Sequence, residues 1–141
     1  KRMLSSMTPT ILLRDGRVST VIGTPGGSRI ITMVLLGILD FMQGNEPESW
    51  VSLPRFHHQY VPDRIMAEPD AFTPEQIEAL EAMGHEVRVS ERTWGNMHGV
   101  MWNRASGEVS AGSDPRWPSG RPTASSSGTP TATRPVPATR Y

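Results

Sequence analysis

Short alternating runs of apolar and polar residues open the chain and are followed by a long apolar stretch. Residues 10–13 and 18–23 are two short runs rich in β-branched side chains, and Asp15-Gly16 lies between them. Asp-Gly between two such runs is a strong signal for a two-residue hairpin. The pattern therefore predicts an antiparallel pair of strands.

The stretch from residue 28 to 43 has helical spacing and is apolar nearly all round. Two sets of apolar residues recur at helical intervals: Ile30, Val34, Ile38 and Phe41, and Ile31, Leu35, Leu39 and Met42. A helix that is apolar on every side is usually buried on both sides. The stretch also contains Asp40 and is too short to span a bilayer. We therefore expect a buried helix and no membrane span.

Shorter elements follow. A helical stretch at 46–53 ends at Pro54, and residues 56–61 form a predicted strand with 64–68 as its partner. Thr73 is a predicted N-cap, with Pro74 at the first helical position and Gln76 as the capping-box partner. This helix is expected to stop at Gly84.

Three more strands are predicted after this helix, at residues 86–90, 100–102 and 108–111. The last two are expected to pair across residues 105–107. The order of elements predicts an α+β fold, in which helices cover antiparallel sheets.

Composition changes near Arg116. Residues 117–141 are mostly Pro, Ser, Thr, Gly and Ala, with three arginines and no acidic residue. Such a segment buries too little apolar surface to offset chain entropy. We therefore expect one ordered domain over residues 1–116 and a disordered tail over 117–141.

Charge and cysteine content exclude several functional classes. The formal net charge is zero, and there is no basic run of the kind that nucleic acids or membrane surfaces attract. There is no cysteine, which excludes disulfides, thiol catalysis and cysteine metal sites. His57-His58 is the remaining candidate metal pair. On a strand their side chains point to opposite faces, so we expect a structural role and no metal site.

Two segments are candidates for binding an anion. Ser5-Ser6 is either a local turn or a pair of hydroxyl donors suited to a carboxylate. The sequence Thr24-Pro25-Gly26-Gly27 is a type II turn signal. Two glycines just ahead of a helix also leave amide N–H groups free to form an oxyanion hole. A phosphate loop is the weaker alternative, because the Lys and Ser/Thr of a Walker-type loop are absent.

Four sequence elements occur in an order that resembles one enzyme family. They are Ser-Ser-Met-Thr-Pro at 5–9, Pro-Gly-Gly-Ser-Arg at 25–29, Pro-Arg-Phe-His-His-Gln at 54–59 and Ser-Asp-Pro-Arg at 113–116. Over residues 1–116 the chain resembles the C-terminal part of the light subunit of gamma-glutamyltransferases, also called glutathione hydrolases. That family ends soon after the last element, whereas this chain continues into its Pro/Ser/Thr-rich tail.

The resemblance implies an N-terminal-nucleophile hydrolase with an αββα sandwich, made by self-cleavage of a precursor into two subunits. The nucleophilic Thr would lie upstream of Lys1, so this chain alone is expected to be inactive. By the same resemblance, Ser5 and Ser6 hold the α-carboxylate of the γ-glutamyl group. The amides of Gly26 and Gly27 form the oxyanion hole.

Further expectations follow from the resemblance. The substrate is glutathione or a related γ-glutamyl compound, no cofactor is needed, and the location is the periplasm or outside the cell. The partners are the remaining light-subunit segment and the large subunit. Two alternatives stay open: a related acylase acting on cephalosporin-type side chains, and a non-catalytic fragment or interaction module.

Overall fold

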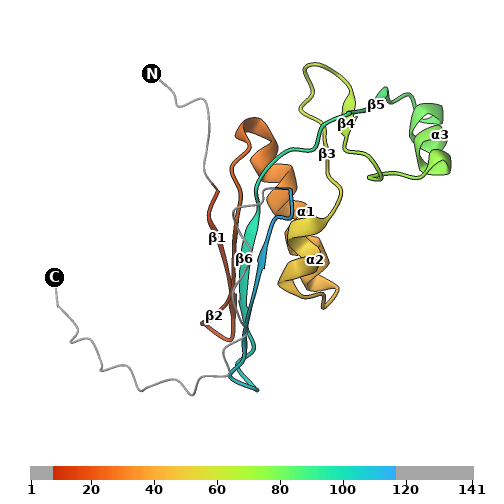
Figure 1. Ribbon diagram of the computed structural model, residues 1–141. Coiled ribbons are helices and arrows are strands. Elements are labelled where there is room, and N and C mark those ends of the chain that lie inside the picture. Colours follow the sequence, from red (N-terminus) through yellow and green to blue (C-terminus); the bar gives the residue numbers. More distant parts are fainter. Residues whose placement is uncertain (1–7, 117–141) are drawn as a thin grey trace, which may run out of the picture.

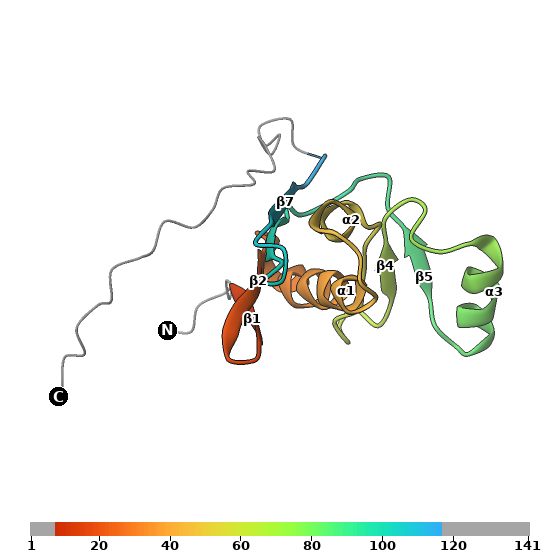
Figure 2. The same cartoon turned by 90° about the horizontal axis from the view of Figure 1, so that it is seen from below.

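The computed structural model describes residues 8–116. Ser5, Ser6 and the tail that we expect to be disordered lie outside the described residues. The described chain forms layers in the order sheet, helices, sheet and helix, as Figures 1 and 2 show from two directions. This mixture of helices and mainly antiparallel strands confirms the predicted α+β class.

The first sheet contains four antiparallel strands in the order β1-β2-β6-β7. Their bounds are Thr10–Arg14, Arg17–Gly23, His98–Trp102 and Val109–Ser113. The predicted hairpin between β1 and β2 is confirmed, and its turn residues Asp15 and Gly16 have φ angles of 51° and 72°. Positive φ at both positions is the geometry that makes Asp-Gly favourable there. The predicted pairing of β6 with β7 is confirmed too.

Two helices cover one face of this sheet. A 3-10 turn, η1 (Gly27–Arg29), leads into α1 (Ile30–Met42), and α2 (Pro47–Ser52) follows. Both predicted helices are confirmed. Trp50 of α2 is 1% exposed and lies in a core with residues of α1, β2 and the loop before β6. The close approach of α2 requires Gly112 on β7, where a Cβ would lie 2.5 Å from the Pro47 carbonyl oxygen.

The second sheet has the order β3-β4-β5, with bounds Phe56–His57, Ile65–Ala67 and Val87–Val89. Helix α3 (Pro74–Ala82) connects β4 to β5. Its predicted start is confirmed, because Thr73 and Gln76 form the reciprocal bonds of a capping box. Gly84 follows the helix with φ +93°, as expected at its end. No helix within residues 8–116 is long and apolar enough to cross a membrane.

Two expectations about the second sheet are wrong. The strand predicted over 56–61 ends at His57, because Tyr60 has a positive φ of 70° and the Gln59 side chain bonds to the Val61 carbonyl. The pairing of β4 with β5 is parallel, whereas antiparallel sheets were expected. A helix connects these two strands, and such a crossover returns the chain in the same direction.

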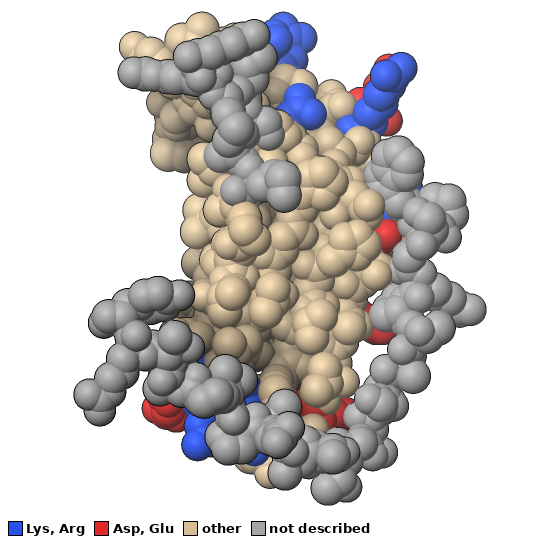
Figure 3. Space-filling view, turned by 90° about the vertical axis from the view of Figure 1, so that its left-hand side faces the viewer, with Lys and Arg blue, Asp and Glu red and all other residues tan. Residues whose placement is uncertain are grey.

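The expectation that α1 is buried on both sides is wrong for the described residues. One stripe packs on the first sheet, but a second apolar stripe is exposed, namely Ile31, Leu35, Leu39 and Met42. The outer face of the first sheet is similar, since Ile11, Val21 and Val100 are cross-strand partners in one exposed row. Figure 3 shows the middle of this face without charged side chains. Within residues 8–116 nothing covers either surface.

Candidate active site

The loop from Thr24 to Gly27 joins the end of β2 to the first turn of the α1 region. Gly26 and Gly27 have φ angles of +156° and +60°. The type II turn expected over residues 24–27 is not formed, because the φ of Gly26 lies far from the value of roughly +80° that this turn requires there. The loop is closed instead by the Arg29 N–H, which donates to the Gly26 carbonyl at 3.3 Å.

Among residues 8–116, the backbone N–H groups of Gly26 and Gly27 have no hydrogen-bond acceptor. Both residues are exposed. The two groups are adjacent and precede α1, where the helix dipole favours negative charge. This arrangement suits an anion or a carbonyl oxygen that gains negative charge during a reaction.

The segment Trp94 to Met97 lies directly under this loop. Thr24 Oγ1 accepts a hydrogen bond from the Asn96 N–H at 3.2 Å and donates to the Pro25 carbonyl at 2.9 Å. Gly95, with φ +83°, is packed so closely that a Cβ would lie 2.6 Å from Met33 Sδ. The 94–97 segment therefore supports the glycine loop and fixes its position relative to α1.

A cluster of buried charged side chains also binds the backbone of the 94–97 segment. Arg55 is 1% exposed and donates through Nη2 to Asp114 Oδ2 at 2.6 Å and through Nη1 to the Trp94 carbonyl. Asp114 Oδ2 also accepts from the Met97 N–H at 3.0 Å.

Glu68 completes the cluster. Its Oε1 accepts from the Trp94 N–H at 2.7 Å, and its Oε2 pairs with Arg116 Nη2 at 2.6 Å. The chain near Asp114 is thereby connected to the glycine loop through buried hydrogen bonds.

The cluster shifts the protonation of its members. Burial by itself raises the pKa of Asp114, but the N–H groups of Arg116 and Met97 and the Arg55 guanidinium outweigh it and hold the pKa below its ordinary value. Burial lowers the pKa of Arg55, an effect that the hydrogen bond to Asp114 partly offsets. Asp114 is therefore an ionised carboxylate at neutral pH.

Sequence reasoning did not assign a role to Arg55, Asp114 or Thr24. The first two stand within the Pro-Arg-Phe-His-His-Gln and Ser-Asp-Pro-Arg elements, so the motifs signalled them without showing that they meet. Ser5 and Ser6 lie outside the described residues. Of the predicted site residues, the structure describes Gly26 and Gly27.

The two adjacent histidines lie in different environments, as predicted. His57 is buried and contacts Thr32 Oγ1 through Nδ1 at 2.9 Å and Gln59 Oε1 through Nε2 at 3.0 Å. His58 is exposed and contacts Asp63. Over residues 8–116 there is no group of three or more His, Asp or Glu side chains that could hold a metal ion.

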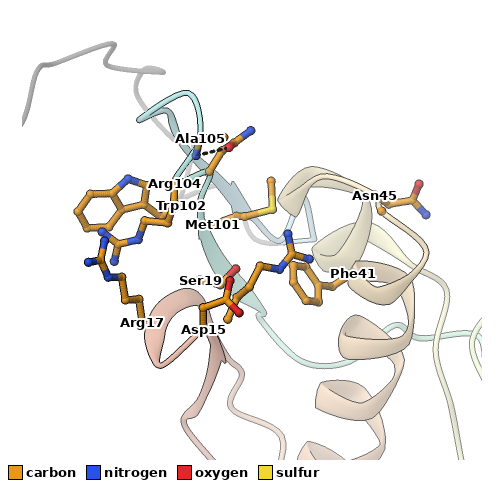
Figure 4. A pocket seen from close by; sticks show the side chains of 12 residues that line it. Asp15, Arg17, Ser19, Phe41, Asn45, Met101, Trp102, Arg104 and Ala105 are labelled. Atoms are coloured by element: carbon orange, nitrogen blue, oxygen red, sulfur yellow. Dashed lines mark hydrogen bonds between the residues drawn. The ribbon is translucent and has the colours of Figure 1, made fainter.

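Two cavities flank α1. One of about 420 Å³ lies beside the glycine loop, and a larger one of about 670 Å³ lies near the C-terminal end of the helix. Figure 4 shows the larger cavity, with Arg17, Trp102 and Arg104 on one side and Phe41 on the other. Arg104 stacks on Trp102 there, 3.3 Å from the ring centre. Of these two cavities, the smaller has Gly26 and Gly27 among its lining residues.

Comparison with known proteins gives the family of this chain. Residues 1–122 match the sequence profile of the family described as Gamma-glutamyltranspeptidase. The chain belongs to this family.

Curated relatives include the glutathione hydrolase proenzymes of Escherichia coli and Pseudomonas aeruginosa. Each is 42% identical to this chain, over 117 and 122 residues respectively, and each alignment covers 82% of this chain. The same alignments cover 20% and 21% of the two relatives. This chain thus spans about a fifth of their length.

Solved structures show the same fold. A mutant of Helicobacter pylori gamma-glutamyltranspeptidase superposes with a TM-score of 0.76 at 35% identity. The superposition covers 83% of this chain and 64% of that one. The structural neighbours are N-terminal-nucleophile hydrolases, which confirms the fold that the sequence resemblance implies.

Proposed function

We propose that this chain is the C-terminal part of the catalytic light subunit of a γ-glutamyl-transferring enzyme. Its substrate would be glutathione or a related γ-glutamyl compound. The free amides of Gly26 and Gly27 at the start of α1 are the single observation that carries this proposal. The glutathione hydrolase names of the relatives support the substrate class.

In this proposal the nucleophile is an N-terminal threonine in another part of the protein. Its hydroxyl oxygen forms a bond to the γ-carbonyl carbon, while its own amine accepts the hydroxyl proton. The carbonyl oxygen becomes negatively charged and receives hydrogen bonds from Gly26 and Gly27. Collapse of this intermediate breaks the C–N bond, and the leaving amine takes the proton. Water or an amino acid then accepts the γ-glutamyl group.

Ser5 and Ser6 would bind the α-carboxylate of the γ-glutamyl group. Chain geometry supports this assignment, because Thr10 at the start of β1 pairs with Ile22 at the end of β2. The chain thus enters the hairpin at the same end at which the glycine loop leaves it. Two hydroxyl groups suit a carboxylate, which accepts several hydrogen bonds at once.

The partners in this proposal are the rest of the light subunit and the large subunit of the same precursor. The two uncovered apolar surfaces, on the first sheet and on α1, are consistent with such partners. The proposed location, periplasm or outside the cell, rests on the family resemblance. No cofactor is part of the proposed reaction.

The test is expression of the full-length precursor and assay of the processed protein. We expect turnover of a γ-glutamyl anilide and of glutathione. A panel that includes cephalosporin side-chain amides distinguishes the acylase alternative. Absence of γ-glutamyl turnover in a processed, folded protein would overturn the proposal.

A further inference from the structure

The cavity beside the glycine loop is lined from two directions. Gly26, Gly27, Ser28 and Arg29 line it from the loop and η1, and Gln59 and Arg64 line it from the region between β3 and β4. Both residues with free amides therefore border a cavity of about 420 Å³, and Gly26 also borders a second one of about 390 Å³ with Pro25, Gly95 and Asn96.

The charged residues of this cavity are arginines. Arg29 and Arg64 are among its lining residues, and no Asp or Glu is. Neither Arg29 nor Arg64 forms an ion pair with any residue from 8 to 116. Arg64 Nε is buried and has no hydrogen-bond partner among those residues. By contrast, the guanidinium groups of Arg55 and Arg116 are both paired with carboxylates.

The wall of the cavity is held in place by hydrogen bonds. Gln59 Nε2 donates to the Val61 carbonyl at 3.0 Å, so its Oε1 is the acceptor. That oxygen receives the Ser28 hydroxyl at 2.9 Å and faces His57 Nε2 at 3.0 Å. The Arg29 guanidinium lies over the Trp94 ring, 4.5 Å from its centre, which limits its orientation.

We propose that this cavity binds the free carboxylate of the group on the nitrogen side of the scissile amide, through Arg29 and Arg64. The inference rests on the proposed function, in which the γ-carbonyl oxygen lies on the Gly26 and Gly27 amides. In glutathione the nitrogen side is a dipeptide that ends in a carboxylate, and paired guanidinium groups are suited to that anion. An acceptor amino acid or peptide presents the same chemistry when it enters.

The experiment uses the processed full-length enzyme and two donors. Glutathione has a carboxylate in its leaving group, whereas γ-glutamyl-p-nitroanilide has none. We expect Arg64→Gln and Arg29→Gln to lower kcat/KM for glutathione about 10-fold more than for the anilide, as loss of a charge-assisted hydrogen bond predicts. Arg64→Lys retains the charge and should recover part of the loss.

Arg17→Gln is the matched control. Arg17 is an exposed arginine at the start of β2 in the first sheet, and it does not line this cavity. The control variant should have nearly the wild-type kcat/KM for both donors. Equal losses for both donors in the Arg29 and Arg64 variants, or no loss for either, would overturn the proposal.

A second measurement compares substrates with and without the carboxylate. The wild-type enzyme should prefer glutathione over glutathione with its glycine carboxylate converted to an amide, and glycylglycine over glycylglycine amide as acceptor. An effect on the donor alone indicates recognition of the leaving peptide, and an effect on the acceptor alone indicates recognition of the incoming amine. Loss of that preference in Arg29→Gln or Arg64→Gln then locates the recognition in this cavity. No preference in either pair overturns the inference, whereas absence of anilide turnover overturns the proposed function itself.

Discussion

The Thr24 hydroxyl accepts a hydrogen bond from the backbone N–H of Asn96 at 3.2 Å, across 72 positions of sequence. This contact joins the glycine loop to the 94–97 segment, which the Arg55, Asp114 and Glu68 side chains hold in turn. The free amides of Gly26 and Gly27 are thus supported by a buried polar cluster. Such support is what pre-organises hydrogen-bond donors for a transition state.

Thr24→Val should lower kcat of the full-length enzyme with little change in KM. The substitution keeps the shape of the side chain and removes both hydrogen bonds of the hydroxyl, which are worth about 0.5–1.5 kcal/mol each. We expect a decrease of about 2- to 10-fold per bond lost. Thr24→Ser retains the hydroxyl and serves as the control; an equal decrease in both variants would contradict this role of the hydroxyl.

Gly26→Ala should lower kcat by about 10²- to 10³-fold, as loss of an oxyanion donor does. The added Cβ would lie 2.3 Å from Met33 Cε, so either the loop or the Met33 side chain must move. Gly107→Ala is a suitable control, because Gly107 also has a positive φ (+77°) and open space around it, but lies in the β6–β7 turn. Wild-type kcat in a folded Gly26→Ala enzyme would place the oxyanion hole elsewhere.

Ser5→Ala combined with Ser6→Ala should mainly raise KM for γ-glutamyl substrates. Hydrogen bonds to a carboxylate contribute about 1.5–3 kcal/mol each in ground and transition state alike. Steady-state kinetics on the processed enzyme measures the effect. Unchanged kinetics in the double variant would remove the carboxylate role from this pair.

Asp114 should make the folded protein sensitive to acid. Its pKa lies below the ordinary value of 3.8 in the folded state, so the unfolded chain binds a proton first as pH falls. Its stabilisation is complete at neutral pH and is lost as pH falls below about 3.8 towards the folded-state pKa. Urea unfolding of the full-length enzyme at several pH values measures this loss.

Asp114→Asn removes the ionisable carboxyl group and tests whether Asp114 causes the acid sensitivity. Removing one partner of a buried ion pair costs about 3–5 kcal/mol, so the variant should be less stable at pH 7. Its stability should also fall less steeply below pH 4 than that of the wild type. Parallel pH profiles for the two proteins would show that Asp114 does not cause the acid sensitivity.

Local signals explain which parts of the fold could be predicted. The Asp15-Gly16 turn and the Thr73 cap depend on residues next to one another, and both are confirmed. The end of β3 depends on the Gln59 side chain bonding within its own loop, which no periodicity reveals.

In the candidate site, too, local features could be predicted and contacts between distant residues could not. Gly26 and Gly27 could be predicted as site residues because glycines before a helix are a local signal. The Arg55–Asp114 pair joins residues 59 positions apart. The cavity with Arg29 and Arg64 likewise depends on how the second sheet packs beside α1. Neither relationship is visible in a single sequence without its fold.

The 141-residue chain by itself should be inactive and should expose apolar surface. Its outer sheet face carries Ile11, Val21 and Val100, which are 58%, 41% and 43% exposed, and a fold of packed layers covers such a face. We expect the isolated chain to bind a hydrophobic dye or to self-associate, and to show no turnover of a γ-glutamyl anilide.

Paired substitutions separate this surface from the core. Val21→Thr with Val100→Thr should reduce dye binding by the isolated chain and change its stability little, because both side chains are exposed there. Val51→Thr, at a position 1% exposed, should destabilise the chain by leaving a buried hydroxyl without a partner. In the full-length enzyme Val21→Thr with Val100→Thr should also be destabilising, because in the proposed function the rest of the protein covers this face. An isolated chain that is monomeric, does not bind the dye and unfolds cooperatively at high temperature would contradict this account of the sheet face.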